Sequence, residues 1–149
     1  MRYETEKDRE IENEILTQAI ELQPGCQWNA RKITGKNEWR YHADFFVTDG
    51  GSKKSFFLEV KDRRTWNDSF DSVLLDVCKW RNLLSLSAAT GLPCVFMPRL
   101  AGKIFALTLS REIIPRANFV WIGRTDRNDP DDGQPCIMIP LNLFREVGA

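Results

Sequence analysis

Residues 41–61 read YHADFFVTDGGSKKSFFLEVK, two apolar runs joined by a turn of glycine, serine and lysine. The aromatic and β-branched residues predict two strands, and the turn composition predicts an antiparallel pairing. Alternation along the second strand places Glu59 and Lys61 on one face and directs Val60 into the core. A hairpin of this length can bring Asp44 beside Glu59.

This predicted cluster of two carboxylates and one ammonium group is suited to a particular chemistry. Two carboxylates that lie close together repel each other unless a cation lies between them, and Mg²⁺ is the hard dication that prefers oxygen ligands. Lys61 would lie beside the metal, where it can stabilise a phosphate oxygen or hold and help deprotonate an attacking water. These groups are typical of phosphodiester hydrolysis.

The remaining sequence predicts a mixed α/β order around the hairpin. A periodic apolar pattern from Thr5 to Leu22, ended by Pro24 and Gly25, predicts a first helix, and a second is predicted over Ser69–Ala89. Strands are predicted over Cys26–Ile33, Trp39–Val47, Ser55–Lys61, Pro93–Met97, Lys103–Leu109 and Phe119–Ile122. We therefore expect an α/β domain with a central mixed sheet, helices on both faces and extra strands near the C-terminus.

The motif in this context resembles the PD-(D/E)xK nuclease superfamily, which has a restriction-endonuclease-like α-β-β-β-α-β core with its acids on the second and third strands. Asp44 matches the first acid, Glu59 the second and Lys61 the lysine, while Ala43 stands where the family name has proline. The resemblance covers about residues 5–97 of a single expected domain, 1–149, and leaves 98–149 as an extension. In size and element order the chain looks most like Holliday junction resolvases and small phage or VRR-type nucleases.

The first predicted helix carries a candidate third acid, as several members of the resembled superfamily do. At about 100° per residue, Glu12 falls in the middle of the apolar face of this helix. A carboxylate at that position is costly unless it is paired or binds a cation. We therefore predict Glu12 as a metal ligand, with Glu10 as the substitute if the register differs and a buried ion pair with an arginine from another element as the alternative.

The resemblance implies a nuclease that uses Mg²⁺, with Mn²⁺ as a substitute, and that acts on DNA, with RNA left open. Glu12, Asp44, Glu59 and the backbone carbonyl of Val60 would hold the metal, and Lys61 would position the attacking water. It also implies a homodimer, because cutting two strands needs two sites. The apolar segments Phe119–Ile122 and 136–144 are candidates for the dimer surface.

Basic and aromatic residues near the motif are candidates for nucleic-acid contact. Arginines can clamp phosphates and an indole can stack on an unpaired base. The candidates are Arg63, Arg64 and Trp66 after the motif and Lys53 and Lys54 before it, with Arg31, Lys32 and Lys36 as an extension of the same surface. Each is also an ordinary turn residue, and packing is equally open for Trp66.

Other residues receive structural interpretations. Lys79 and Arg81 are expected on a solvated helix face, and His42 is expected to be packed or solvated, although it can share a face with Asp44. The tryptophans in apolar patterns are expected in the core: Trp28, Trp39, Trp80 and Trp121.

Composition sets the limits of these interpretations. The chain has 149 residues with 21 basic and 21 acidic side chains, and this neutral balance argues against tight non-specific binding to duplex DNA. No apolar run is long enough to span a bilayer, so we expect a cytoplasmic protein without membrane association. The four cysteines have neither zinc nor disulfide spacing, and no small-molecule cofactor is indicated.

Two alternatives to a nuclease remain. One is an inactive nuclease-like fold that binds nucleic acid or a protein partner, and the other is an unrelated α/β interaction domain.

Overall fold

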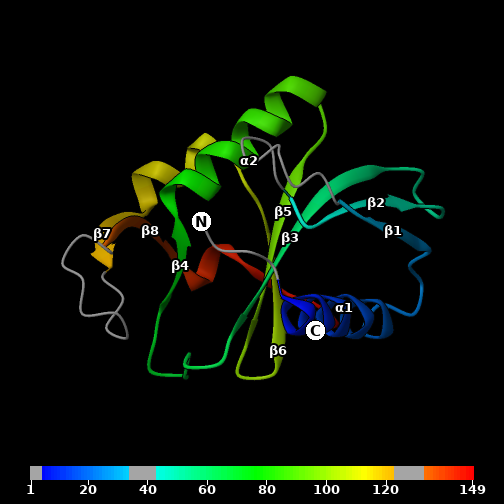
Figure 1. The fold of residues 1–149 in the computed structure, drawn as a ribbon, viewed down its shortest axis with the longest axis horizontal. Helices are drawn as coiled ribbons and strands as arrows, with labels where there is room; N and C mark the ends of the chain where they lie inside the picture. Colours follow the sequence, from blue (N-terminus) through cyan, green and yellow to red (C-terminus); the bar gives the residue numbers. More distant parts are fainter. Residues whose placement is uncertain (1–4, 34–42, 123–132) are drawn as a thin grey trace.

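The computed structural model describes residues 5–33, 43–122 and 133–149 (Figure 1). Its helices and strands follow in the order α1 (Glu6–Glu21), β1 (Trp28–Lys32), β2 (Phe45–Asp49), β3 (Ser55–Arg63), β4 (Ser72–Asp76), α2 (Val77–Thr90), β5 (Cys94–Leu100), β6 (Lys103–Thr108), β7 (Asn118–Ile122), β8 (Gln134–Pro140) and β9 (Arg145–Glu146). Two short 3₁₀ helices, Arg111–Arg116 and Leu141–Leu143, flank β7 and β8.

The larger sheet has six strands in the order β1-β2-β3-β5-β6-β9 and is mixed, because β3 and β5 are parallel while the other neighbours are antiparallel. Helix α1 covers one face, where Ile15 and Ala19 are fully buried against residues such as Phe45 and Leu58. Arg99 of β5 holds this helix through a hydrogen bond to Glu14.

The opposite face of the large sheet is covered by α2 and by a second sheet, which has three antiparallel strands in the order β4-β8-β7. Figure 1 shows α1 and α2 on opposite sides of β3 and β5. The core on this side contains Trp80 and Leu83 of α2, Phe96 of β5, and Leu75 and Ile137 of the small sheet. The predicted α/β class, with a central mixed sheet between helices and extra C-terminal strands, is therefore confirmed.

The predicted second helix begins too early. Residues 72–76 form β4 instead, and α2 begins at Val77, where the side chain of Asp76 accepts hydrogen bonds from the backbone amides of Cys78 and Lys79. Val73 and Leu75 alternate into the core, and the strand pairs with β8. The backbone hydrogen-bonding groups of residues 72–76 are satisfied by β8, a distant part of the chain. This pairing outweighs the local helical pattern.

The two apolar segments that were candidates for a dimer surface differ in exposure. Within 136–144, Ile137 and Ile139 are fully buried because they belong to β8, the central strand of the small sheet. Phe119 and Trp121 lie on the edge strand β7 and are 56% and 65% exposed, so the prediction of Trp121 as a core residue was wrong. Within the described ranges, none of the helices has the length and apolar character needed to cross a membrane.

Candidate active site

The structure brings Asp44 and Glu59 together at the open end of the β2–β3 hairpin. Asp44 directly precedes β2, and its backbone amide donates to the carbonyl of Leu58 at 3.0 Å, which places it opposite Glu59. Its carboxylate Oδ2 accepts a hydrogen bond of 2.9 Å from the amide of Val60. Asp44 and Glu59 are only 4% and 2% exposed, so two acids are buried beside each other at one end of the sheet.

Alternation along β3 determines which way Glu59 points. Leu58 and Val60 pack into the core beneath α1, so Glu59 and Lys61 lie on the opposite face, toward α2. There the Nζ of Lys79, in the first turn of α2, lies 3.3 Å from Glu59 Oε1. The prediction of a solvated Lys79 was therefore wrong, whereas Arg81 is exposed as expected.

The environment of Glu59 favours the protonated carboxyl group. Burial is the main cause that raises the pKa of Glu59 to about 8, and the nearby charge of Asp44 adds to it. The ammonium groups of Lys79 and Lys61 act in the opposite direction. In the metal-free protein these two lysines thus only partly compensate for the burial of the acidic pair.

The donor atoms of this pair fit a hard divalent cation. Glu59 Oε2 is buried and has no hydrogen-bond partner among the described residues, which is costly for a carboxylate oxygen and leaves it available as a ligand. Asp44 and Glu59 supply the oxygen ligands that Mg²⁺ prefers. Within residues 5–33, 43–122 and 133–149, however, no group of three or more histidine, cysteine, aspartate or glutamate side chains is arranged to hold a metal ion.

The candidate third acid, Glu12, is connected to the pair through a lysine. Glu12 is partly buried on α1, as its position on the helix predicts, and its carboxylate forms an ion pair with the Nζ of Lys32. The same Nζ lies 3.7 Å from Asp44 Oδ1 and over the ring of Phe45. Lys32, expected at a nucleic-acid surface, therefore bridges Glu12 and Asp44. Glu10 is exposed.

The candidate nucleic-acid residues fall into two groups. Arg63 and Trp66 turn inward: each donates a side-chain hydrogen bond to a β4 carbonyl, of Leu74 and Ser72 respectively, and Trp66 packs against the core. Burial also lowers the pKa of Arg63. In contrast, Arg64 is exposed beside Asp62, and Lys53 and Lys54 are exposed in the β2–β3 turn, at the far end of the hairpin from Asp44. His42, Lys36 and Trp39 lie outside the described residues.

Two buried acids lie side by side, Asp44 directly before β2 and Glu59 on β3, and Lys61 follows the second acid by two residues. Together with a mixed sheet that has helices on both faces, this arrangement defines the PD-(D/E)xK nuclease class. A family model described as "Phage putative PDDEXK endonuclease" matches residues 1–147. The chain belongs to this family.

A solved structure shows the same fold. The chain is similar to Hjc, a Holliday junction resolvase from the archaeal hyperthermophile Archaeoglobus fulgidus, with a TM-score of 0.57 and 13% sequence identity. The match covers 95% of this chain and 92% of the resolvase chain. At this identity it shows a common fold. None of the curated proteins compared with the chain matches it in sequence.

Proposed function

We propose that this protein is a metal-dependent nuclease that hydrolyses DNA phosphodiester bonds, and that branched DNA is among its substrates. One observation carries the proposal: Asp44 and Glu59 are buried side by side, and Glu59 Oε2 has no hydrogen-bond partner among the described residues. Burying an acidic pair destabilises a fold, so its presence in a core otherwise built from apolar side chains supports a functional role.

Asp44, Glu59 and the backbone carbonyl of Val60 are the proposed ligands of Mg²⁺, for which Mn²⁺ would substitute. When bound, the metal would polarise the scissile phosphate and lower the pKa of the attacking water. The Val60 amide fixes the orientation of Asp44 through the 2.9 Å hydrogen bond. Lys61 follows Glu59 on the same face and is partly exposed, so its ammonium group can reach the water or a phosphate oxygen.

Glu12 is the proposed third acid, and its ion pair with Lys32 determines whether its carboxylate can bind the metal. In the structure described here, the ammonium group of Lys32 supplies the positive charge between Glu12 and Asp44. Glu12 can join the other acids only if this ion pair rearranges. Since a dication carries twice the charge of an ammonium group, its binding beside Asp44 would favour that rearrangement.

Cleavage of both strands of a duplex or junction needs two sites, and we therefore propose that the protein acts as a homodimer. The exposed edge strand β7, with Phe119 and Trp121, supports an apolar contact between chains. Light scattering after size-exclusion chromatography tests this. A particle of twice the mass of the chain is expected, and a monomer at working concentration would contradict it.

The test of the nuclease proposal is cleavage of labelled four-way junction, linear duplex, single-stranded and plasmid DNA in the presence of Mg²⁺, Mn²⁺ or EDTA. Asp44→Asn retains an oxygen that accepts from Val60, and Lys61→Met retains the side-chain stem. Each variant is expected to lower the cleavage rate by about 100-fold or more. Lys103→Met is the matched control, because Lys103 is exposed and pairs only loosely, at 3.8 Å, with Glu146.

Metal-dependent cutting that disappears in the two site variants and persists in the control is the expected result. Cutting that survives both site variants would indicate a contaminating nuclease. If the folded wild-type protein cuts none of these DNAs, the alternative of a nuclease fold that only binds nucleic acid or a protein partner takes its place.

A further inference from the structure

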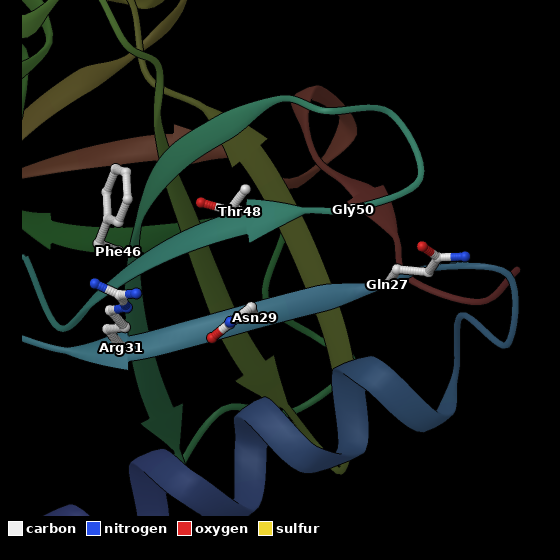
Figure 2. A pocket seen from close by; sticks show the side chains of 6 residues that line it. All are labelled: Gln27, Asn29, Arg31, Phe46, Thr48 and Gly50. Carbon is white, nitrogen blue, oxygen red and sulfur yellow. The ribbon is translucent and has the colours of Figure 1, made fainter.

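A cleft lies on β1 and β2, on the sheet face to which Glu59 points. It has a volume of about 380 Å³ and is lined by Gln27, Asn29, Arg31, Phe46, Thr48 and Gly50 (Figure 2). Roughly 300–1,000 Å³ is the usual size of small-molecule sites, so the cleft can hold a group the size of a nucleotide.

The cleft and Glu59 lie on the same face of the sheet. In β2, Phe45 and Val47 pack beneath α1, so Phe46 and Thr48 project from the other face. The ring of Phe46 contacts that of Phe57, which is two residues before Glu59 and packs against the core beneath α2. The register pairs Phe46 with Arg31 and Thr48 with Asn29. The cleft therefore begins next to Asp44 and runs along the hairpin away from it.

The lining combines one aromatic ring, one cation and several uncharged hydrogen-bonding groups. Figure 2 shows Arg31 and Phe46 together at one end and Gln27 at the other. Arg31 is exposed, and within the described part of the chain its guanidinium group forms no ion pair. Among the described residues, none of those that line the cleft is acidic. Asp49, which stands between the lining residues Thr48 and Gly50 in the sequence, accepts hydrogen bonds from the backbone amides of Gln27 and Gly51.

We propose that this cleft binds an unpaired nucleotide of the DNA substrate next to the cleaved bond, with its base against Phe46 and a phosphate on Arg31. The inference rests on the proposed nuclease function and specifies its substrate: DNA in which bases near the cut are unpaired. An aromatic face stacks on any base, and a guanidinium group matches phosphate geometry.

The spacing along β2 agrees with this assignment. Phe46 is two residues from Asp44, or about 7 Å along the strand. Consecutive phosphates of an extended strand lie at a comparable distance, so a phosphate at the acids leaves the neighbouring nucleotide over Phe46 and Arg31. Asn29, Gln27 and Thr48 then offer hydrogen bonds to its base or sugar.

The experiment measures binding by fluorescence anisotropy, in EDTA, with a labelled duplex that carries a bulge of unpaired thymidines and with the fully paired duplex of the same length. Phe46→Leu removes the stacking ring, and Phe46→Tyr restores it. Arg31→Gln removes the phosphate contact. Arg111→Gln is the matched control, since Arg111 is an exposed residue in the 3₁₀ helix before β7. Figure 1 shows this segment, in yellow, beside β7 and α2 and on the opposite side of the molecule from β1 and β2.

Wild-type protein is expected to bind the bulged duplex more tightly than the paired one. Phe46→Leu should weaken binding of the bulged duplex by about tenfold and leave the paired duplex nearly unchanged, with Phe46→Tyr close to wild type. Arg31→Gln should weaken binding and reduce the dependence of log Kd on log salt by about one. The Arg111→Gln control should match wild type, and circular dichroism verifies that each variant is folded.

Absence of a preference for the bulged duplex in wild type, or a preference that survives both Phe46→Leu and Arg31→Gln, would overturn the proposal. If Phe46→Leu does not fold, the salt dependence of Arg31→Gln decides alone. The two proposals fail separately. If the wild-type protein cuts no DNA but prefers the bulged duplex in a way that depends on Phe46, the nuclease proposal fails and the binding site stands. If the protein cuts DNA normally and neither Phe46→Leu nor Arg31→Gln changes binding, the binding site fails and the nuclease proposal stands.

Discussion

Replacing Glu59 by glutamine should abolish a fall in stability that the metal-free protein shows as the pH rises. Glu59 is buried, and its pKa is raised to about 8 by burial and by Asp44. In the unfolded chain the pKa returns to its ordinary value of 4.5. Between these two values the native state binds a proton that the unfolded state has lost, so the free energy of unfolding decreases as the pH increases.

The size of this decrease follows from the shift in the pKa of Glu59. Each unit of difference between the folded and unfolded pKa corresponds to about 1.4 kcal/mol. Between about pH 5 and about pH 8, the wild-type protein should lose on the order of 3 kcal/mol. That is a large part of the roughly 5–15 kcal/mol that stabilises a domain, and it corresponds to a decrease in Tm of about 10 °C.

Urea unfolding of wild type, Glu59→Gln and a Glu10→Gln control over this pH range, in EDTA, measures the effect. Glu10 is exposed, so its variant should follow wild type, while Glu59→Gln should show a much flatter dependence. Mg²⁺ added near pH 8 should restore stability to wild type and not to Glu59→Gln. Parallel curves for wild type and Glu59→Gln would refute the reasoning about the buried pair.

Two further predictions concern residues that the structure places differently from the sequence analysis. Lys79→Met removes a charge that lowers the pKa of Glu59, so the pH at which Mg²⁺ begins to raise the Tm should increase by roughly half to one unit. If thermal melts show that this pH is unchanged, the contact between Lys79 and Glu59 is contradicted. Ile137→Ala opens a cavity in the core and should cost about 2–5 kcal/mol in urea unfolding without changing the oligomeric state. A dimer that dissociates with little loss of stability would instead place Ile137 at an interface.

The acidic pair was predictable because strand alternation and hairpin register are local rules. Asp44 and Glu59 belong to one hairpin, so their juxtaposition follows from the turn between them. Glu12 was also placed correctly on the buried side of α1, because helical periodicity depends only on spacing. Its role as a metal ligand stays a prediction, since the side chain is paired with Lys32 in the structure.

What could not be predicted depends on contacts between distant segments. Val73 and Leu75 fit a helix as well as a strand until β8 is present to pair with them. Because the predicted helix began too early, the sequence analysis did not place Lys79 in the first turn of α2. Asp76, a suitable N-cap residue, could have indicated the correct start. A lysine in the first turn of a helix is opposed by the helix dipole, and this was the available signal that Lys79 has a specific partner.

The small sheet has a consequence for how the chain folds. Its central strand, β8, comes last of the three in the sequence and pairs Met138 with both Leu74 and Asn118. During synthesis β4 and β7 therefore have no pairing partner until β8 emerges. Until then their backbone edges and the core beneath α2 are exposed to solvent. Removing residues from Gln134 onward would leave a chain that retains both acids of the pair and lacks the strand that completes the core behind them.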